Sequence, residues 1–158
     1  MLNLKNSKGF TLLEVLIVVA IIVIIAGIAM PRFLGISEQG RKAKAMGDLR
    51  VLQTAVESYI LNTNKLPASG TTLETANPQI ISDFTKDFAD PFAANGTSNY
   101  KYVSQANAET GKKYYAFASG GPNQTVGGLS INEENGTIAV ADPDDIIVTN
   151  AQKVTGED

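Results

Sequence analysis

Hydrophobic positions are distributed unevenly along this chain of 158 residues. The segment from Phe10 to Met30 is almost entirely apolar, whereas the remainder is polar and rich in glycine, asparagine, threonine and serine. At 1.5 Å per residue, these 21 residues form a helix of about 31 Å, which is enough to cross the ~30 Å hydrocarbon core of a bilayer. We therefore predict a transmembrane helix at residues 10–30.

The hydrophobic period changes after this segment. Apolar side chains recur every three or four positions, and charged side chains occupy the other faces, which predicts an amphipathic helix with one buried stripe. The stripe consists of Met46, Leu49, Leu52, Val56, Tyr59 and Ile60. Residues 62–64 resemble a turn, and Pro67 disfavours helix at the residue before it. The sequence thus predicts one long helix over residues 10–62, transmembrane in its front half and amphipathic in its back half.

The remaining residues, 63–158, are predicted to form a soluble globular head. Residues 80–88 are expected to form a short helix or an irregular loop. Aromatic and β-branched residues then gather in short runs separated by glycine-rich turns, which predicts strands. These runs are Tyr100–Ser104, Tyr114–Ala118, Thr137–Ala141 and Ile146–Thr149. We expect a small antiparallel sheet packed on the apolar stripe of the helix, which is an α+β fold.

Two ordinary interpretations of the apolar segment leave something unexplained. A secretory signal peptide has an apolar region of ~7–15 residues and then a small-residue cleavage site, but this run is longer and continues into a helical pattern. A plain membrane anchor explains the length but not the acid Glu14 inside the run. An acid at the centre of a membrane helix costs ~2.5–3.5 kcal/mol on insertion scales, and less near its end. Glu14 either reaches the lipid headgroups or gains a cationic partner, such as a free amine at Phe10, when subunits pack together.

The residues KGFTLLEVLIVVAII resemble the leader and helix start of type IV pilins and of the pseudopilins of type II secretion. The resemblance implies that residues 1–9 are a basic leader that a membrane prepilin peptidase removes by cutting after Gly9. It also implies N-methylation of the new first residue, Phe10. Glu14, the fifth residue after the cut, is implied to neutralise the amine of a neighbouring subunit during assembly. Pro31 matches the position of a helix kink in this family.

The charges add little to the assignment of orientation. Lys5 and Lys8 precede the apolar run, but Arg32 and Arg41 follow it, so the positive-inside count is weak. Orientation therefore depends on the resemblance, which implies a single-pass inner-membrane protein with its head in the periplasm. The net charge of −3 becomes −5 when the two leader lysines are removed. The sequence does not have the cluster of basic residues that is typical of a nucleic-acid-binding protein.

Cysteine and histidine are absent from the chain. This excludes cysteine and histidine nucleophiles, imidazole bases and zinc sites that use these residues. The carboxylates, serines, threonines, lysines and tyrosines that remain form no recognisable catalytic motif. We therefore predict that the protein is not an enzyme, and a membrane-anchored binding or hydrolytic module is the alternative class.

The head resembles the major pseudopilin of type II secretion more loosely. Asp90-Pro91-Phe92, the run from Tyr114 to Asn123, and the acids near the C-terminus match its pattern, but an insert at about residues 129–141 separates them. In that family the loop binds calcium, which implies a site that takes oxygen ligands. The implied ligands are Ser119, Asn123, Asp142, Asp144 and Asp145. The family commonly has an aspartate where Asn123 stands, and the acids are alternatively solvated turn residues.

The expected function is that of a structural filament subunit, with the major pseudopilin of a type II secretion system favoured. The alternative is a type IV pilus subunit used for adhesion, motility or DNA uptake. The implied partners are membrane lipid before assembly, copies of this chain, minor pilins or pseudopilins, the prepilin peptidase, and an inner-membrane assembly platform with a cytoplasmic ATPase. Calcium is the one expected cofactor.

Overall fold

The computed structural model describes residues 9–75, 79–94, 98–151 and 154–155. The predicted leader, except Gly9, therefore lies outside the described residues. The chain forms two compact units, Met1–Glu38 and Gln39–Asp158, which are described separately below.

The first unit contains the front part of helix α1 (Leu12–Thr63). The helix begins after Thr11, whose side-chain Oγ1 accepts a hydrogen bond from the backbone N–H of Glu14 at 3.2 Å. This contact satisfies one of the N–H groups that a helix start leaves without an intrahelical partner. The 19 residues Leu12–Met30 are long and apolar enough to span a membrane, and none of them is buried within the chain. The apolar surface of this segment therefore needs lipid or another polypeptide to cover it.

In the second unit, α1 continues to Thr63, one residue beyond the predicted end. Leu49, Leu52 and Val56 of the predicted stripe are fully buried, and Tyr59 and Ile60 pack against the core. Met46 was also predicted to be in the stripe, but it is 37% exposed and Ala45 is buried in its place. The buried stripe of the helix therefore passes through position 45 and not position 46.

The chain then crosses to the sheet through short helices. A 3₁₀ helix, η1, spans Gly70–Leu73, and a single turn of α-helix, α2, spans Phe84–Asp87. Residues 80–88 were predicted to form a short helix or an irregular loop, and the structure has a helical turn at residues 84–87 within this segment. Asp83 caps α2 by accepting a hydrogen bond from the N–H of Lys86 at 2.9 Å, and hydrogen bonding to Thr85 and Lys86 lowers the pKa of this carboxyl.

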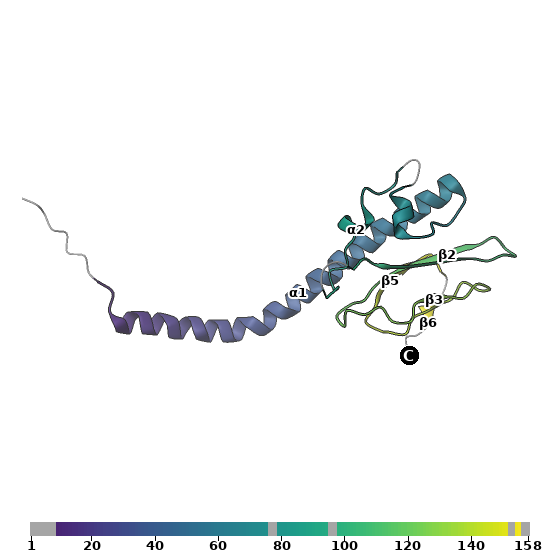
Figure 1. Cartoon of the computed structure of the whole chain (residues 1–158). Coiled ribbons are helices and arrows are strands. Elements are labelled where there is room, and N and C mark those ends of the chain that lie inside the picture. The colour runs from purple at the N-terminus through teal and green to yellow at the C-terminus, as the bar shows by residue number, and fades with distance from the viewer. Residues whose placement is uncertain (1–8, 76–78, 95–97, 152–153, 156–158) are drawn as a thin grey trace, which may run out of the picture. The chain divides into compact units, whose positions relative to one another are not determined.

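The main sheet has three antiparallel strands in the order β1-β2-β5. Of these, β2 and β5 are labelled in Figure 1. The strands are β1 (Lys101–Ala106), β2 (Lys113–Ser119) and β5 (Ile146–Thr149). The register pairs Lys101 with Ala118 and Ala116 with Thr149. All three strands were predicted, and β5 has the predicted bounds.

A second small sheet has the order β3-β4-β6, with β3 (Ser130–Ile131), β4 (Ile138–Ala139) and β6 (Val154–Thr155). The β3–β4 pair is antiparallel and the β4–β6 pair is parallel. The insert at residues 129–141 therefore folds into a hairpin of its own, of which the sequence predicted only one strand, Thr137–Ala141.

The central strand β2 has both faces buried, which places it between two apolar clusters. Tyr115 and Phe117 pack with Leu49, Leu52 and Val56 of the helix, whereas alternate residues pack on the other face. That second cluster consists of Ala116, Ala118, Leu129 and Ile138. The predicted α+β arrangement of a helix covered by a small antiparallel sheet is confirmed.

Two tyrosines, Tyr100 just before β1 and Tyr115 within β2, also reach carboxylates of the helix. The hydroxyl of Tyr100 donates to Asp48 at 2.8 Å, and that of Tyr115 donates to Glu57 at 3.0 Å. Burial, followed by these hydrogen bonds, raises the pKa of both tyrosines above the ordinary range. The two contacts therefore keep neutral phenols against carboxylates and fix the sheet along the helix.

Candidate functional site

The predicted processing site lies at the accessible start of the described chain. Gly9 and Phe10 precede α1, both are exposed, and 82% of the Phe10 surface is accessible. A Cβ added at Gly9 would meet no atom within 4 Å. The fold therefore imposes no requirement for glycine at position 9, so any such requirement would come from an enzyme that reads this sequence.

Glu14 lies in the first turn of α1, where a negative charge is favoured by the helix dipole. Its side chain is exposed, and within the described part of the chain its carboxylate contacts no cation. The carboxylate is thus available to an amine from another chain. The helix continues through Pro31, and the kink predicted there stays a prediction.

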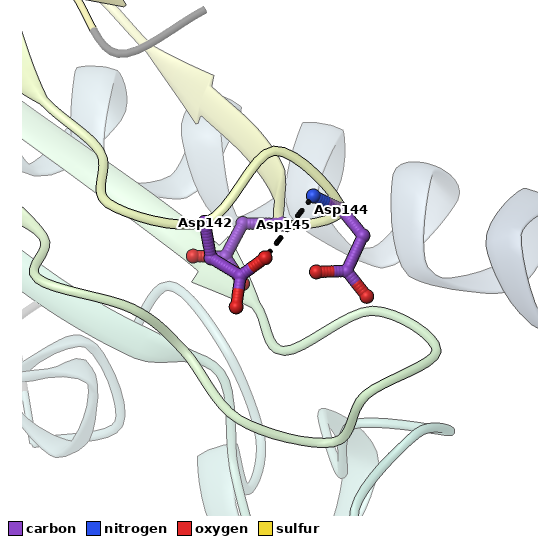
Figure 2. A group of neighbouring side chains, drawn as sticks. All are labelled: Asp142, Asp144 and Asp145. Carbon is purple, nitrogen blue, oxygen red and sulfur yellow. Dashed lines mark hydrogen bonds between the residues drawn. The ribbon is translucent and has the colours of Figure 1, made fainter.

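The second candidate site is formed by three aspartates on the turn that leads into β5. Asp142, Asp144 and Asp145 each offer a carboxylate oxygen, and these three oxygens lie within 4.8 Å of one another (Figure 2). The backbone N–H of Asp144 donates to Oδ1 of Asp142 at 3.4 Å, which is a long hydrogen bond. The structure thus brings together the three acids that the sequence marked as metal ligands.

Asn123 also reaches this turn, from the loop that follows β2. Its Nδ2 donates to Oδ2 of Asp142 and to Oδ1 of Asp144, the latter at 2.8 Å. Its backbone N–H donates to Oδ2 of Asp144 at 3.0 Å. Hydrogen bonding to Asp144 and then to Asn123 lowers the pKa of Asp142.

Asp145 is in a different electrostatic situation. Its Oδ2 accepts from the N–H of Gly127 at 3.0 Å, whereas its buried Oδ1 has no hydrogen-bond partner in the described structure. Burial raises the pKa of this carboxyl, the Gly127 hydrogen bond opposes that rise, and the charges of Asp142 and Asp144 raise the pKa further. Asp145 is thus the acid of the group that gains most from a proton or a cation.

Ser119 was also predicted as a ligand, but its hydroxyl belongs to another network. It donates to Oδ1 of Asp90 at 2.8 Å, and Asp90 also accepts from the N–H groups of Phe92 at 2.9 Å and Gly120 at 3.0 Å. Asp90 is only 6% exposed. The sequence analysis marked Asp90-Pro91-Phe92 as a motif but did not identify Asp90 as the acceptor that joins this segment to the end of β2.

The donor set can be compared with what calcium requires. Calcium takes six to eight oxygen ligands. The unpartnered Oδ1 of Asp145 suits a cation, but the oxygen of Asn123 accepts from the N–H and the hydroxyl of Thr125, at 2.8 and 3.0 Å. In this arrangement the hydroxyl of Ser119 donates to Asp90 and the oxygen of Asn123 is occupied by Thr125, so neither side chain directs an oxygen toward the three acids as a calcium site of these five ligands requires. Calcium binding stays an untested prediction.

Comparison with known proteins bears on the N-terminal site. Residues 4–30 match the family model described as the prokaryotic N-terminal methylation motif. Over 72 residues the chain is 40% identical to a fimbrial protein of Pseudomonas aeruginosa, an alignment that covers 46% of this chain and 47% of the relative. The chain thus spans about half the length of that relative.

Two longer alignments extend into the head. The chain is 29% identical over 133 residues to the type II secretion system core protein G of Escherichia coli (strain K12), which covers 77% of this chain and 86% of the relative. It is 29% identical over 136 residues to a type IV major pilin of Neisseria gonorrhoeae, which covers 84% of this chain and 67% of the relative. Both alignments cover far more residues than the helix contains, so both include much of the head.

Proposed function

We propose that this chain is a member of the family of type IV pilins and type II secretion pseudopilins, and that it is the major pseudopilin of a type II secretion system. Members of this family are structural subunits and not enzymes. The observation that carries the proposal is the N-terminal methylation motif on an apolar helix that the chain itself leaves uncovered, together with the alignment to core protein G through most of the head.

The assembly mechanism follows from this helix. Leu12–Met30 is soluble in lipid before assembly, and packing against the same segment of neighbouring copies removes its apolar surface from any contact with water. Glu14 is costly in both settings unless it is paired, and the free amine of a processed Phe10 in a neighbouring copy supplies the charge. Repeating one heterologous contact with a rotation that does not close generates an open helical fibre.

The partners and location follow as part of the proposal. A prepilin peptidase cuts after Gly9 and methylates Phe10, and minor pseudopilins join the filament. An inner-membrane platform with a cytoplasmic ATPase supplies the work of assembly. The apolar helix anchors the unassembled subunit in the inner membrane, and the head lies in the periplasm.

The processing step is tested by mass spectrometry of the mature N-terminus from the native cell. We expect a chain that begins with N-methyl-Phe10, because the motif places both reactions there. A mature chain that retains Met1 and lacks methylation would show that the segment is a plain anchor.

A type IV pilus subunit is the second candidate, and the alignments to the fimbrial protein and the gonococcal pilin support it. Deletion of the gene separates the two. Loss of protein export with surface fibres intact supports the pseudopilin, whereas loss of surface fibres with normal export supports the pilus subunit.

A further inference from the structure

The carboxamide nitrogen of Asn123 lies between two carboxylates of the acid turn. Asn123 belongs to the loop after β2. Asp142 and Asp144, whose carboxylates it contacts, follow it in the sequence by 19 and 21 residues. One nitrogen atom donates to both of them. The side chain therefore holds two mutually repelling groups together with its two N–H bonds.

The orientation of this carboxamide is fixed by Thr125. Oδ1 of Asn123 accepts from the backbone N–H of Thr125 at 2.8 Å and from its hydroxyl at 3.0 Å. A flipped amide would place its NH₂ group against the N–H of Thr125 and its oxygen against the carboxylates. Turning the oxygen toward a cation would thus break these contacts, so the nitrogen is the atom that faces the acids.

The carboxylates of the turn are largely satisfied by N–H donors of the protein. Five of their six oxygens accept hydrogen bonds, and only Oδ1 of Asp145 does not. Asn123 supplies three of these bonds through its side chain and its backbone. Hydrogen bonds to a charged group are stronger than those between neutral groups, so this set can hold the loop.

We propose that the Asn123 carboxamide replaces a divalent cation in this loop, so that the head keeps its fold with no metal ion bound. Asn123 is then the residue that determines whether the loop needs calcium. An aspartate at this position has the same shape but replaces the donor by an acceptor and adds a fourth negative charge beside Asp142, Asp144 and Asp145. A bound divalent cation would offset this repulsion.

The test compares thermal unfolding of the full-length wild type and Asn123→Asp in non-ionic detergent, in EDTA and in excess CaCl₂. Near-ultraviolet circular dichroism of tyrosine reports the second unit, Gln39–Asp158, because all five tyrosines lie at or beyond residue 59. We expect the same wild-type Tm in both solutions. For Asn123→Asp we expect a Tm lower by about 5–15 °C in EDTA and largely restored by calcium.

Asn132→Asp is the matched control, because it makes the same chemical change at an exposed turn. Oδ1 of Asn132 accepts from the backbone N–H groups of Glu134 and Asn135, and its Nδ2 donates no hydrogen bond to any described residue. A carboxylate can accept the same two bonds, so we expect a Tm close to that of the wild type and no response to calcium.

Two results would overturn the proposal. One is a wild-type Tm that rises by several degrees from EDTA to calcium, and the other is an Asn123→Asp variant as stable as the wild type in EDTA. If Asn123→Asp does not fold in either solution, calorimetric titration of the wild type with CaCl₂ tests directly whether the wild type binds calcium. Heat of binding at one site per chain refutes the proposal, and its absence supports it.

Discussion

Asp90 is the buried acceptor on which the connection between the helix side of the head and the end of β2 depends. It accepts hydrogen bonds from the hydroxyl of Ser119 and from the N–H groups of Phe92 and Gly120, at 2.8, 2.9 and 3.0 Å. Asp90→Ala leaves two buried backbone donors without an acceptor, and each such donor costs about 1–3 kcal/mol. Asp90→Ala also removes the cost of burying a charged carboxylate, which offsets part of this loss. We expect a decrease of about 3–5 kcal/mol in the free energy of unfolding.

Two other variants of the Asp90 network are expected to lose less free energy of unfolding. Ser119→Ala removes one donor and leaves the carboxylate with two, so we expect a loss of about 1 kcal/mol. Asp90→Asn keeps Oδ1 for Phe92 and Ser119 but turns an NH₂ group toward the N–H of Gly120, so its cost should lie between the other two.

Urea unfolding in non-ionic detergent, followed by tyrosine circular dichroism, measures these differences for the second unit, Gln39–Asp158. The reasoning fails if Asp90→Ala costs less than about 1 kcal/mol, or if Ser119→Ala costs as much as Asp90→Ala, because the carboxylate would then not be the shared acceptor.

Three further changes probe processing, assembly and the acid turn. Gly9→Leu should leave the fold intact, since a side chain there meets no atom, but it should block cleavage; normal mature protein on a mass spectrum would place the cut elsewhere. Glu14→Ala should be cleaved normally yet give little filament in a sedimentation assay, and an undiminished filament yield would remove Glu14 from assembly. Gly121→Ala should destabilise the head by more than about 2 kcal/mol, because φ is +54° and the added Cβ would collide with the backbone oxygen of Asp144; an unchanged urea midpoint would contradict this.

Local pattern was sufficient to predict most of the secondary structure. Strands β1, β2 and β5 lie within two residues of the expected runs, because alternation and turn residues act over a few positions. The hairpin β3–β4 was only half predicted, since Ser130–Ile131 is too short to produce a periodic signal. The helix stripe was correct except at Met46, where the choice between Met46 and Ala45 depends on how closely the sheet approaches.

The amino-acid sequence alone determined the apolar segment, the methylation motif and the presence of acids near the C-terminus, because each depends on residue types at short, fixed spacings. Tertiary structure decided which polar groups meet. Ser119 and Asp90 are 29 residues apart, and Tyr100 and Asp48 are 52 apart, so no local period joins them. Tertiary structure also places the nitrogen of Asn123, and not its oxygen, beside Asp142 and Asp144, because the oxygen accepts a hydrogen bond from Thr125. Residue type shows that an amide can donate or accept, but only its neighbours in space select which.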